Sequence, residues 1–201
     1  MEQPIVIDNF LPEIYQKSII DLLTGVEFPW TFHRYSVSNE PLDPYWHIDE
    51  PHKEHIQFRH IFADDNVVRS EFFQYVKPLI VAFEMQYGKK VKSFRRLKSN
   101  LLMPQKGPIT QQPHIDGMAL IDGVRDAVGK KTLLYYVNDS DGDTVLYNEY
   151  FTNEPLGLLT KQQIVPPKKG RAVIFDSNQL HAGCCPSESD CRIILNFVLE
   201  V

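Results

Sequence analysis

Short, largely hydrophobic runs separated by polar turn residues dominate the second half of the chain. Each run has the length of a β-strand and is bounded by glycine, proline or acidic residues that favour turns. The predicted strands cover 91–103, 131–138, 144–147, 163–165, 171–175, 180–183 and 192–199. No helical pattern separates the later runs, so the second half is predicted to form an all-β jelly roll.

The first half mixes strand and helix patterns. Strands are predicted over 5–8 and 28–37, and a helix over 12–23, where proline is tolerated in the first turn. Residues 66–87 also repeat with helical period, and Pro78 should kink or divide that helix. Its expected buried face is Val67, Phe72, Phe73, Val76, Leu79, Ile80, Phe83 and Met85. Two such amphipathic helices would cover the outer face of a sheet.

Length and composition fit one globular domain. The chain has 201 residues, of which 43% are hydrophobic and 23% charged, and no apolar run is long enough to span a membrane. We expect a single domain over 1–201, with a strand and helix support layer at 1–90 and a jelly-roll core at 91–201 that holds the functional site. The fold class is therefore mainly β with α support, an α+β arrangement.

The charge distribution argues against nucleic acid as a partner. The net charge is −5, whereas sequence-independent binding to nucleic acid depends on neutralising phosphates. One local exception is a cluster of six cations: Lys89, Lys90, Lys92, Arg95, Arg96 and Lys98. We interpret this cluster as a solvated strand edge that charge protects from aggregation, with an anion-steering patch as the alternative.

The termini and cysteines indicate a reducing compartment. Met1 to Pro4 has no basic or apolar signal sequence, so we expect a cytoplasmic protein. Cys184, Cys185 and Cys191 are odd in number and two are adjacent, which argues against a disulfide framework. We expect them to be reduced packing residues.

A candidate metal site begins at His114 and Asp116. The two residues are two positions apart in Gln-Pro-His-Ile-Asp, so on an extended strand both side chains leave the same face. His181 follows far downstream and can supply a third ligand. Two histidines and one carboxylate form the facial triad of non-haem Fe(II) oxygenases.

A second His-x-Asp triplet, His47-Ile48-Asp49, is a rival. It lies in the proline-rich, turn-like segment 41–51 and lacks the paired strands that would hold ligands rigidly. We therefore interpret the histidines between His47 and His60 as surface or pocket-rim residues.

The order of motifs resembles a known family. His-x-Asp, Tyr-Tyr-Val-Asn, Asp-Gly-Asp-Thr, His and Arg follow one another between residues 114 and 192. This series is similar to the 2-oxoglutarate- and Fe(II)-dependent dioxygenases of the prolyl-4-hydroxylase-like branch, whose core is a double-stranded β-helix. The opening Ile-Val-Ile-Asp-Asn-Phe-Leu-Pro also resembles the first strand and helix of that branch.

The resemblance implies Fe(II), 2-oxoglutarate and O₂ as cofactor and cosubstrates. His114, Asp116 and His181 would hold the iron. Arg192 would bind the distal carboxylate of 2-oxoglutarate through its planar guanidinium, helped by the hydroxyl of Tyr136. Tyr135 should face the other way and pack. One departure is Met103, which stands near the position of a second tyrosine in many of these hydroxylases.

Strand alternation places Arg192, Ile194 and Asn196 on one face, which we expect to point into the barrel. The resemblance then implies an oxygenase that hydroxylates a C–H bond of a small molecule or peptide, prolyl or otherwise, and converts 2-oxoglutarate to succinate. The alternative is a non-catalytic jelly-roll module that binds a metal. A cupin-like enzyme is disfavoured, because no Glu-containing metal motif lies between the two histidines.

Overall fold

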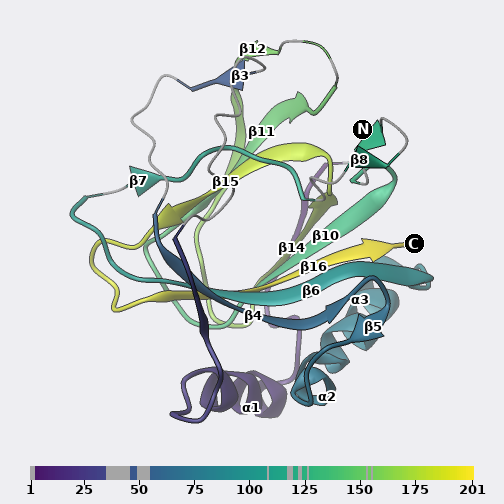
Figure 1. Cartoon of the computed structure of the whole chain (residues 1–201), viewed down its shortest axis with the longest axis vertical. Helices are drawn as coiled ribbons and strands as arrows, with labels where there is room; N and C mark the ends of the chain where they lie inside the picture. Colours follow the sequence, from purple (N-terminus) through teal and green to yellow (C-terminus); the bar gives the residue numbers. More distant parts are fainter. Residues whose placement is uncertain are drawn as a thin grey trace.

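Two antiparallel sheets that face each other form the body of the protein (Figure 1). The computed structural model describes residues 3–34, 46–48, 55–107, 109–116, 120–121, 124–125, 127–152, 154 and 156–201. Side chains of both sheets meet between them in a cluster that includes Leu134, Leu146 and Ile194. The mainly β architecture predicted from the hydrophobic pattern is confirmed.

The larger sheet has the order β1-β14-β10-β16-β6-β4-β2, and β5 pairs with β4. Its strands are β1 (Ile5–Ile7), β2 (Thr31–His33), β4 (Gln57–Asp64), β5 (Val67–Val68), β6 (Ser93–Leu102), β10 (Lys130–Tyr136), β14 (Ala172–Asp176) and β16 (Arg192–Glu200). The strand β6 lies between β16 and β4, so it is an interior strand of this sheet.

The smaller sheet has the order β13-β11-β15-β7. Its strands are β7 (Ile109–Thr110), β11 (Thr144–Tyr150), β13 (Lys161–Val165) and β15 (Gln179–Cys185). Two further pairs are β3 (Trp46–His47) with β12 (Gly157–Leu158), and β8 (Leu120–Ile121) with β9 (Val124–Arg125). The three cysteines are free thiols.

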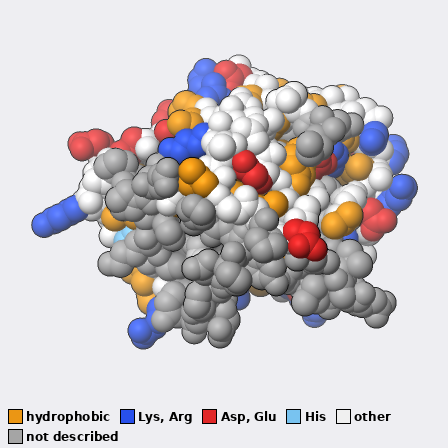
Figure 2. Space-filling model, turned by 90° about the horizontal axis from the view of Figure 1, so that it is seen from above, with side chains coloured by type: hydrophobic (Ala, Val, Ile, Leu, Met, Phe, Trp, Pro, Cys, Tyr) orange, Lys and Arg blue, Asp and Glu red, His pale blue; other side chains and the backbone are white. Residues whose placement is uncertain are grey.

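Three helices lie against the outer face of the larger sheet (Figure 1). They are α1 (Glu13–Leu23), α2 (Phe73–Val76) and α3 (Pro78–Tyr87). One buried cluster joins Leu23 of α1 and Phe83 of α3 to Tyr135 and Phe197 of the sheet. No helix in the described part of the chain is long and apolar enough to cross a membrane. On the opposite side of the molecule, acidic, basic and apolar side chains are interspersed over the described surface (Figure 2).

The predicted helix over 66–87 is correct only in its second part. Pro78 divides it into α2 and α3, as expected, but residues 67–68 form β5. The reason is a tight turn at Asp65 and Asn66, whose φ angles of 48° and 62° lie in the left-handed region. Val67 and Met85 were expected to be buried, but they are 47% and 79% exposed.

The strand β4 was not predicted at all. It reads Gln-Phe-Arg-His-Ile-Phe-Ala-Asp, so polar and charged residues fall on both faces and neither face is uniformly apolar. Part of its inner face lines a polar cavity and not an apolar core. The usual signal of a half-buried strand is therefore absent from its sequence.

One carboxylate ties two loops of the core together. The Asp141 carboxylate accepts hydrogen bonds from the Ser187 hydroxyl at 2.7 Å and from the backbone N–H groups of Ser187, Glu188 and Ser189 at 2.9–3.0 Å. The Ser187 hydroxyl and these N–H groups hold the pKa of Asp141 well below its usual range, against the opposing effect of burial. Its loop joins β10 to β11, and the loop it binds joins β15 to β16 just before Arg192.

We expect Asp141→Ala to destabilise the protein by about 1 kcal/mol at pH 7, as for the loss of a capping carboxylate. The lowered pKa means that the ionised form stabilises the fold above about pH 4, and that this contribution is lost as the pH falls further. Thermal melts at pH 7 and pH 3 should therefore show a difference between wild type and variant that shrinks at the lower pH. An equal difference at both values would contradict the role of the charge.

Candidate metal centre

The two candidate histidines are joined through their backbones. His114 and His181 form an isolated antiparallel bridge, in which each backbone N–H donates to the other's carbonyl oxygen at 2.9 Å. The regular strand expected around residues 112–116 is not formed, so this bridge fixes His114 in its place. A further bond from Asp116 N–H to the Ser177 carbonyl, 3.0 Å long, holds the third residue. Residues distant in sequence thus converge through backbone pairing.

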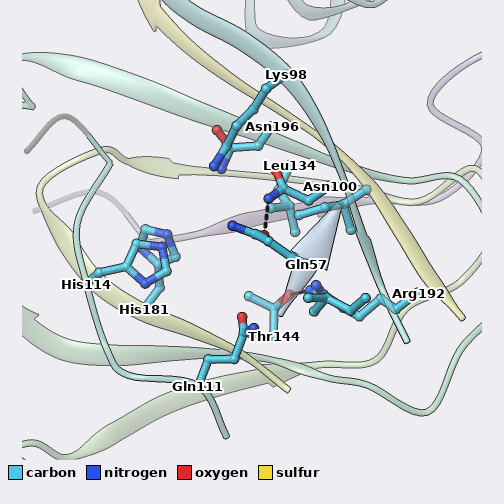
Figure 3. A pocket seen from close by; sticks show the side chains of 13 residues that line it. Gln57, Lys98, Asn100, Gln111, His114, Leu134, Thr144, His181, Arg192 and Asn196 are labelled. Carbon is cyan, nitrogen blue, oxygen red and sulfur yellow. Dashed lines mark hydrogen bonds between the residues drawn. The ribbon is translucent and has the colours of Figure 1, made fainter. Parts of the chain in front are cut away.

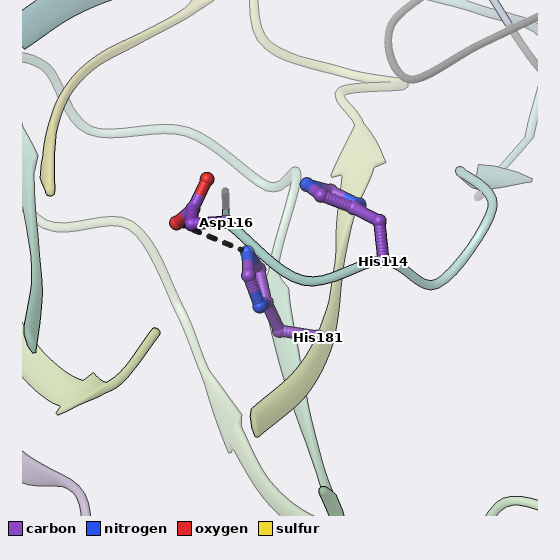
Figure 4. A group of neighbouring side chains, drawn as sticks. All are labelled: His114, Asp116 and His181. Atoms are coloured by element: carbon purple, nitrogen blue, oxygen red, sulfur yellow. Dashed lines mark ion pairs between the residues drawn. The ribbon is translucent and has the colours of Figure 1, made fainter. Parts of the chain in front are cut away.

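The side chains of His114, Asp116 and His181 meet at one point (Figure 4). One ligand atom of each residue lies within 4.8 Å of those of the other two. The Nδ1 atoms of His114 and His181 lie 3.1 Å and 2.9 Å from the carbonyls of Gln112 and Gln179, so each Nδ1–H has an acceptor. Each Nε2 then carries a lone pair, and backbone-oriented imidazoles of this kind are common around metals.

The buried Nε2 of His181 has no hydrogen-bond partner among the described residues and lies 3.5 Å from Asp116 Oδ2. A buried polar atom without a partner is costly, and a metal ion between the three side chains would satisfy it. The residues present therefore fit a divalent metal with nitrogen and oxygen ligands.

Asp116 is held in its ionised form. Its Oδ2 accepts hydrogen bonds from Thr132 Oγ1 at 2.8 Å and from Asn196 Nδ2 at 3.0 Å, and its Oδ1 lies 3.2 Å from Arg96. Burial by itself would raise the pKa of Asp116, but the positive charges at His181 and Arg96 hold it well below its usual range. Asp116 is 1% exposed, so these partners are needed to keep a charge there.

His114 is held in its neutral form, because burial and the neighbouring His181 lower its pKa to about 3. A neutral imidazole and an ionised carboxylate are the protonation states that metal binding requires. His114 and Asp116 are thus ready to bind a metal without releasing a proton.

A cavity adjoins the two histidines and runs between the sheets (Figure 3). Its described walls are formed by Gln57, Lys98, Asn100, Leu102, Gln111, His114, Leu134, Thr144, His181, Gly183, Arg192, Ile194 and Asn196. The predicted inward face of Arg192, Ile194 and Asn196 is confirmed, since all three line it.

Arg192 is the first residue of β16 and lines the cavity four residues before Asn196. It is 2% exposed, and one amino group donates to Thr144 Oγ1 at 2.8 Å. Its Nε has no hydrogen-bond partner, and no described carboxylate forms an ion pair with it. A buried guanidinium with unused donors is a strong binding site for a carboxylate.

Tyr136 lies behind Thr144, and its contact with the cosubstrate stays a prediction. It is fully buried, does not line the cavity, and donates its hydroxyl hydrogen to Thr144 Oγ1 at 2.7 Å. Thr144, which also accepts from Arg192, is the residue that faces the cavity. Tyr135 packs in the outer cluster as predicted, and Leu102 lines the cavity while its neighbour Met103 is 41% exposed.

The interpretation of the basic cluster as a solvated edge is wrong for Arg96 and Lys98. Because β6 is an interior strand, Arg96 reaches Asp116 and Lys98 lines the cavity. Sequence reasoning also missed Gln57, Asn100, Gln111 and Thr144. For β6 a signal was present, since buried Leu97 alternates with Lys98 and Asn100, which gives the strand one apolar and one polar face.

The rival triplet gains no support in the described residues. Asp49, His52 and the side chain of His47 lie outside them. His60 is half-buried and lines a second pocket, as expected for a rim residue; its ring nitrogens bond to Pro29 O and Ser70 Oγ, and its ring packs on Phe28. Among the described residues, His114, Asp116 and His181 are the one group of three that could hold a metal.

Two imidazoles and one ionised carboxylate beside a cavity form the ligand set of non-haem iron oxygenases. Residues 106–199 match the sequence model of the 2OG-Fe(II) oxygenase superfamily. The matched segment is the second half of the chain, which contains His114, Asp116, His181 and Arg192. The cofactor and cosubstrates of the family are Fe(II), 2-oxoglutarate and O₂. No curated protein sequence matches the chain.

Solved structures share the fold at low sequence identity. A prolyl-4-hydroxylase from Pseudomonas putida has a TM-score of 0.58 and 14% identity, over 100% of this chain and 93% of that one. The non-haem α-ketoglutarate-dependent epimerase SnoN from nogalamycin biosynthesis has a TM-score of 0.61 and 11% identity, over 98% and 78%. HygX from Streptomyces hygroscopicus, solved with nickel and 2-oxoglutarate, has a TM-score of 0.57 and 11% identity, over 98% and 82%.

Proposed function

We propose that this protein is a 2-oxoglutarate-dependent dioxygenase in which His114, Asp116 and His181 hold Fe(II). The reaction hydroxylates a C–H bond of an amino-acid or peptide substrate and converts 2-oxoglutarate to succinate. We further propose that residues 1–201 form one domain, whose two facing sheets are the double-stranded β-helix of this superfamily. The family match and the convergence of the three side chains support both proposals.

The observation that carries the function is Arg192. A non-catalytic metal-binding module has no reason to bury a cation with unused donors in the cavity beside its metal site. The distal carboxylate of 2-oxoglutarate supplies the missing partner. Thr144 holds one amino group of Arg192, and Tyr136 holds Thr144, so the guanidinium is oriented before the cosubstrate enters.

The other residues of the centre keep the ligands in place. Bound Fe(II), with 2-oxoglutarate and O₂, supplies the oxidising power for attack on an unactivated C–H bond. Thr132 and Asn196 fix one oxygen of Asp116, Arg96 fixes the other, and the Gln112 and Gln179 carbonyls fix the two imidazoles. Such outer contacts typically change metal affinity by about 10- to 100-fold when removed.

The substrate class is proposed from the chemistry of related folds. One neighbour is named as a prolyl-4-hydroxylase and another as an epimerase, so the shared fold serves more than one reaction. A non-catalytic metal-binding module is the alternative function, and a measurement of turnover distinguishes it from an oxygenase.

We expect the iron-loaded protein to convert 2-oxoglutarate to succinate in air, slowly by itself and faster with its substrate. The test is to incubate the protein with Fe(II), 2-oxoglutarate and candidate amino acids or peptides, and to measure succinate together with the mass of the candidate. A gain of one oxygen atom identifies a hydroxylase. Absence of succinate under all conditions, from a protein that binds Fe(II), would favour the non-catalytic module.

A further inference from the structure

Lys98 is a second cation in the same cavity, distinct from Arg192. It lies near the middle of β6, opposite Asn196 of β16, and its side chain faces inward. No hydrogen bond or ion pair to another described residue satisfies its ammonium group. Burial, followed by the positive charge of Arg96, lowers the pKa of Lys98 to about 7. The charged form of this group therefore destabilises the ligand-free fold.

The wall around Lys98 carries surplus positive charge. Arg96 precedes it by two residues on β6, and half-buried Arg59 stands on β4 opposite Asn100. The charged groups that act on Lys98 are Arg96, Arg59 and Asp116, and Asp116 is the one carboxylate among them. Asp116 is already bonded to Arg96, Thr132 and Asn196, and a metal ion would add further positive charge. Among the described residues, this wall therefore lacks an anion to balance its cations.

The two cations hold separate positions in the cavity. Leu102 pairs with Arg192 across the strands, and Lys98 pairs with Asn196, so four residues of β6 separate the two levels. This corresponds to about 13 Å along the strand. Figure 3 shows Lys98 and Arg192 on opposite sides of the Gln57–Asn100 pair. Because Asn196 also binds Asp116, Lys98 lies at the level of the metal ligands and away from the carboxylate clamp at Arg192.

Unused acceptors lie on the same wall. Asn100 donates to Gln57 Oε1, and its own Oδ1 is buried without a partner, as is Oδ1 of Asn196. A ligand that offers a carboxylate to Lys98 and an N–H or O–H donor to these oxygens would satisfy both needs. The interior of a peptide chain brings no charge and would leave the ammonium group unpaired in a closed site.

We propose that the substrate is a small molecule with a free carboxylate, which binds to Lys98 at the level of the metal ligands and away from Arg192, and that a free amino acid is the simplest member of this class. This inference rests on the proposed oxygenase function. It narrows the substrate from an amino acid or peptide to a compound that carries its own carboxylate beside the reacting position.

The first experiment compares candidate substrates that carry a free carboxylate with neutral analogues of similar shape. The iron-loaded protein is given 2-oxoglutarate with each of the twenty proteinogenic L-amino acids, with their carboxamides, and with the same residues inside N-acetylated, C-amidated tripeptides. We expect at least one free acid to stimulate succinate formation and to gain an oxygen atom, while its carboxamide and its blocked peptide do not. Equal stimulation by a carboxamide or a blocked peptide, or no stimulation by any free acid, would overturn the inference.

The second experiment tests Lys98 itself. Lys98→Met removes the charge and keeps an unbranched side chain, and Lys90→Met is the matched control, because Lys90 is 87% exposed and paired with Glu84. Loss of a charge-assisted bond should weaken the Kd and raise the KM of the active acid by about 10- to 150-fold in Lys98→Met. The Kd for 2-oxoglutarate should change far less, and the Lys90→Met protein should behave as wild type. Equal losses for the acid and for 2-oxoglutarate would show a general disruption of the cavity and contradict the assignment.

The stability of the ligand-free protein separates a binding role from a structural one. Removing an unpaired buried ammonium should raise the melting temperature of Lys98→Met, whereas loss of a structural lysine would lower it. The inference can also fail independently of the oxygenase function. If the protein forms the Fe(II)–2-oxoglutarate complex but its turnover does not depend on a carboxylate of the substrate, the oxygenase function stands and the proposed role of Lys98 is wrong.

Discussion

Replacing His181 with alanine is expected to abolish the visible charge-transfer band that the wild-type protein should give when Fe(II) and 2-oxoglutarate are added without oxygen. The band requires the 2-oxo acid to chelate an iron ion held in the site. His181 supplies a buried Nε2 that has no other described partner, and alanine leaves only His114 and Asp116. His114→Ala should have the same effect, and Asn196→Ala a smaller one of about 10- to 100-fold in iron affinity, because it releases Asp116.

His47→Ala is the matched control, since it removes a histidine from the rival triplet. Absorbance titration of Fe(II) into each 2-oxoglutarate-saturated variant gives the iron affinity directly. We expect the control to bind iron as wild type does. A band that persists in both His114→Ala and His181→Ala, or one that is lost in His47→Ala alone, would show that iron binds elsewhere.

Arg192→Ala should leave iron binding nearly intact and weaken 2-oxoglutarate by about 30- to 150-fold, which corresponds to about 2–3 kcal/mol for a charge-assisted pair in a closed pocket. The guanidinium is 2% exposed and its Nε has no described hydrogen-bond partner, so water competes poorly with the carboxylate for its donors. Arg192→Lys keeps the charge without the planar fork and should fall between wild type and alanine. Tyr136→Phe should cost only about 1 kcal/mol, because its hydroxyl acts through Thr144.

Calorimetric titration of 2-oxoglutarate into each iron-loaded variant tests this order. Arg171→Ala is a suitable control, because Arg171 is also largely buried but pairs with Asp8 outside the cavity. An Arg192→Ala protein that binds 2-oxoglutarate as tightly as wild type would refute the clamp, even if the iron site proved correct.

The local pattern of the chain predicted much of the fold. The strands of the second half were found because each is a short run bounded by turn residues. Successive side chains of a strand point to opposite faces of the sheet, and this alternation depends only on the geometry of an extended chain. The same rule placed Arg192, Ile194 and Asn196 on the inner face correctly. The convergence of His114, Asp116 and His181 was predicted as well, because few residue types suit a metal and their order along the chain resembled a known family.

Other features depended on neighbours that are distant in sequence. The strand β4 carries polar residues toward a cavity, so no apolar period marks it. The turn at Asp65 and Asn66 separates β4 from β5 inside a segment with a helical pattern, because pairing of the two strands outweighs the weaker local preference.

The sequence by itself thus determined the type of most core strands, the candidate ligands and the resemblance to a family, because these depend on residue type and spacing. Only the tertiary structure decided the surroundings of Lys98 and Tyr136. A lysine on an edge strand and a lysine on an interior strand look the same in sequence, and β6 became interior only when β4 paired with it. The hydroxyl of Tyr136 meets Thr144 Oγ1 at 2.7 Å, a contact between residues of the two sheets. Both outcomes arise from strand pairing and sheet packing, which set the surroundings of a side chain and leave no trace in its local sequence.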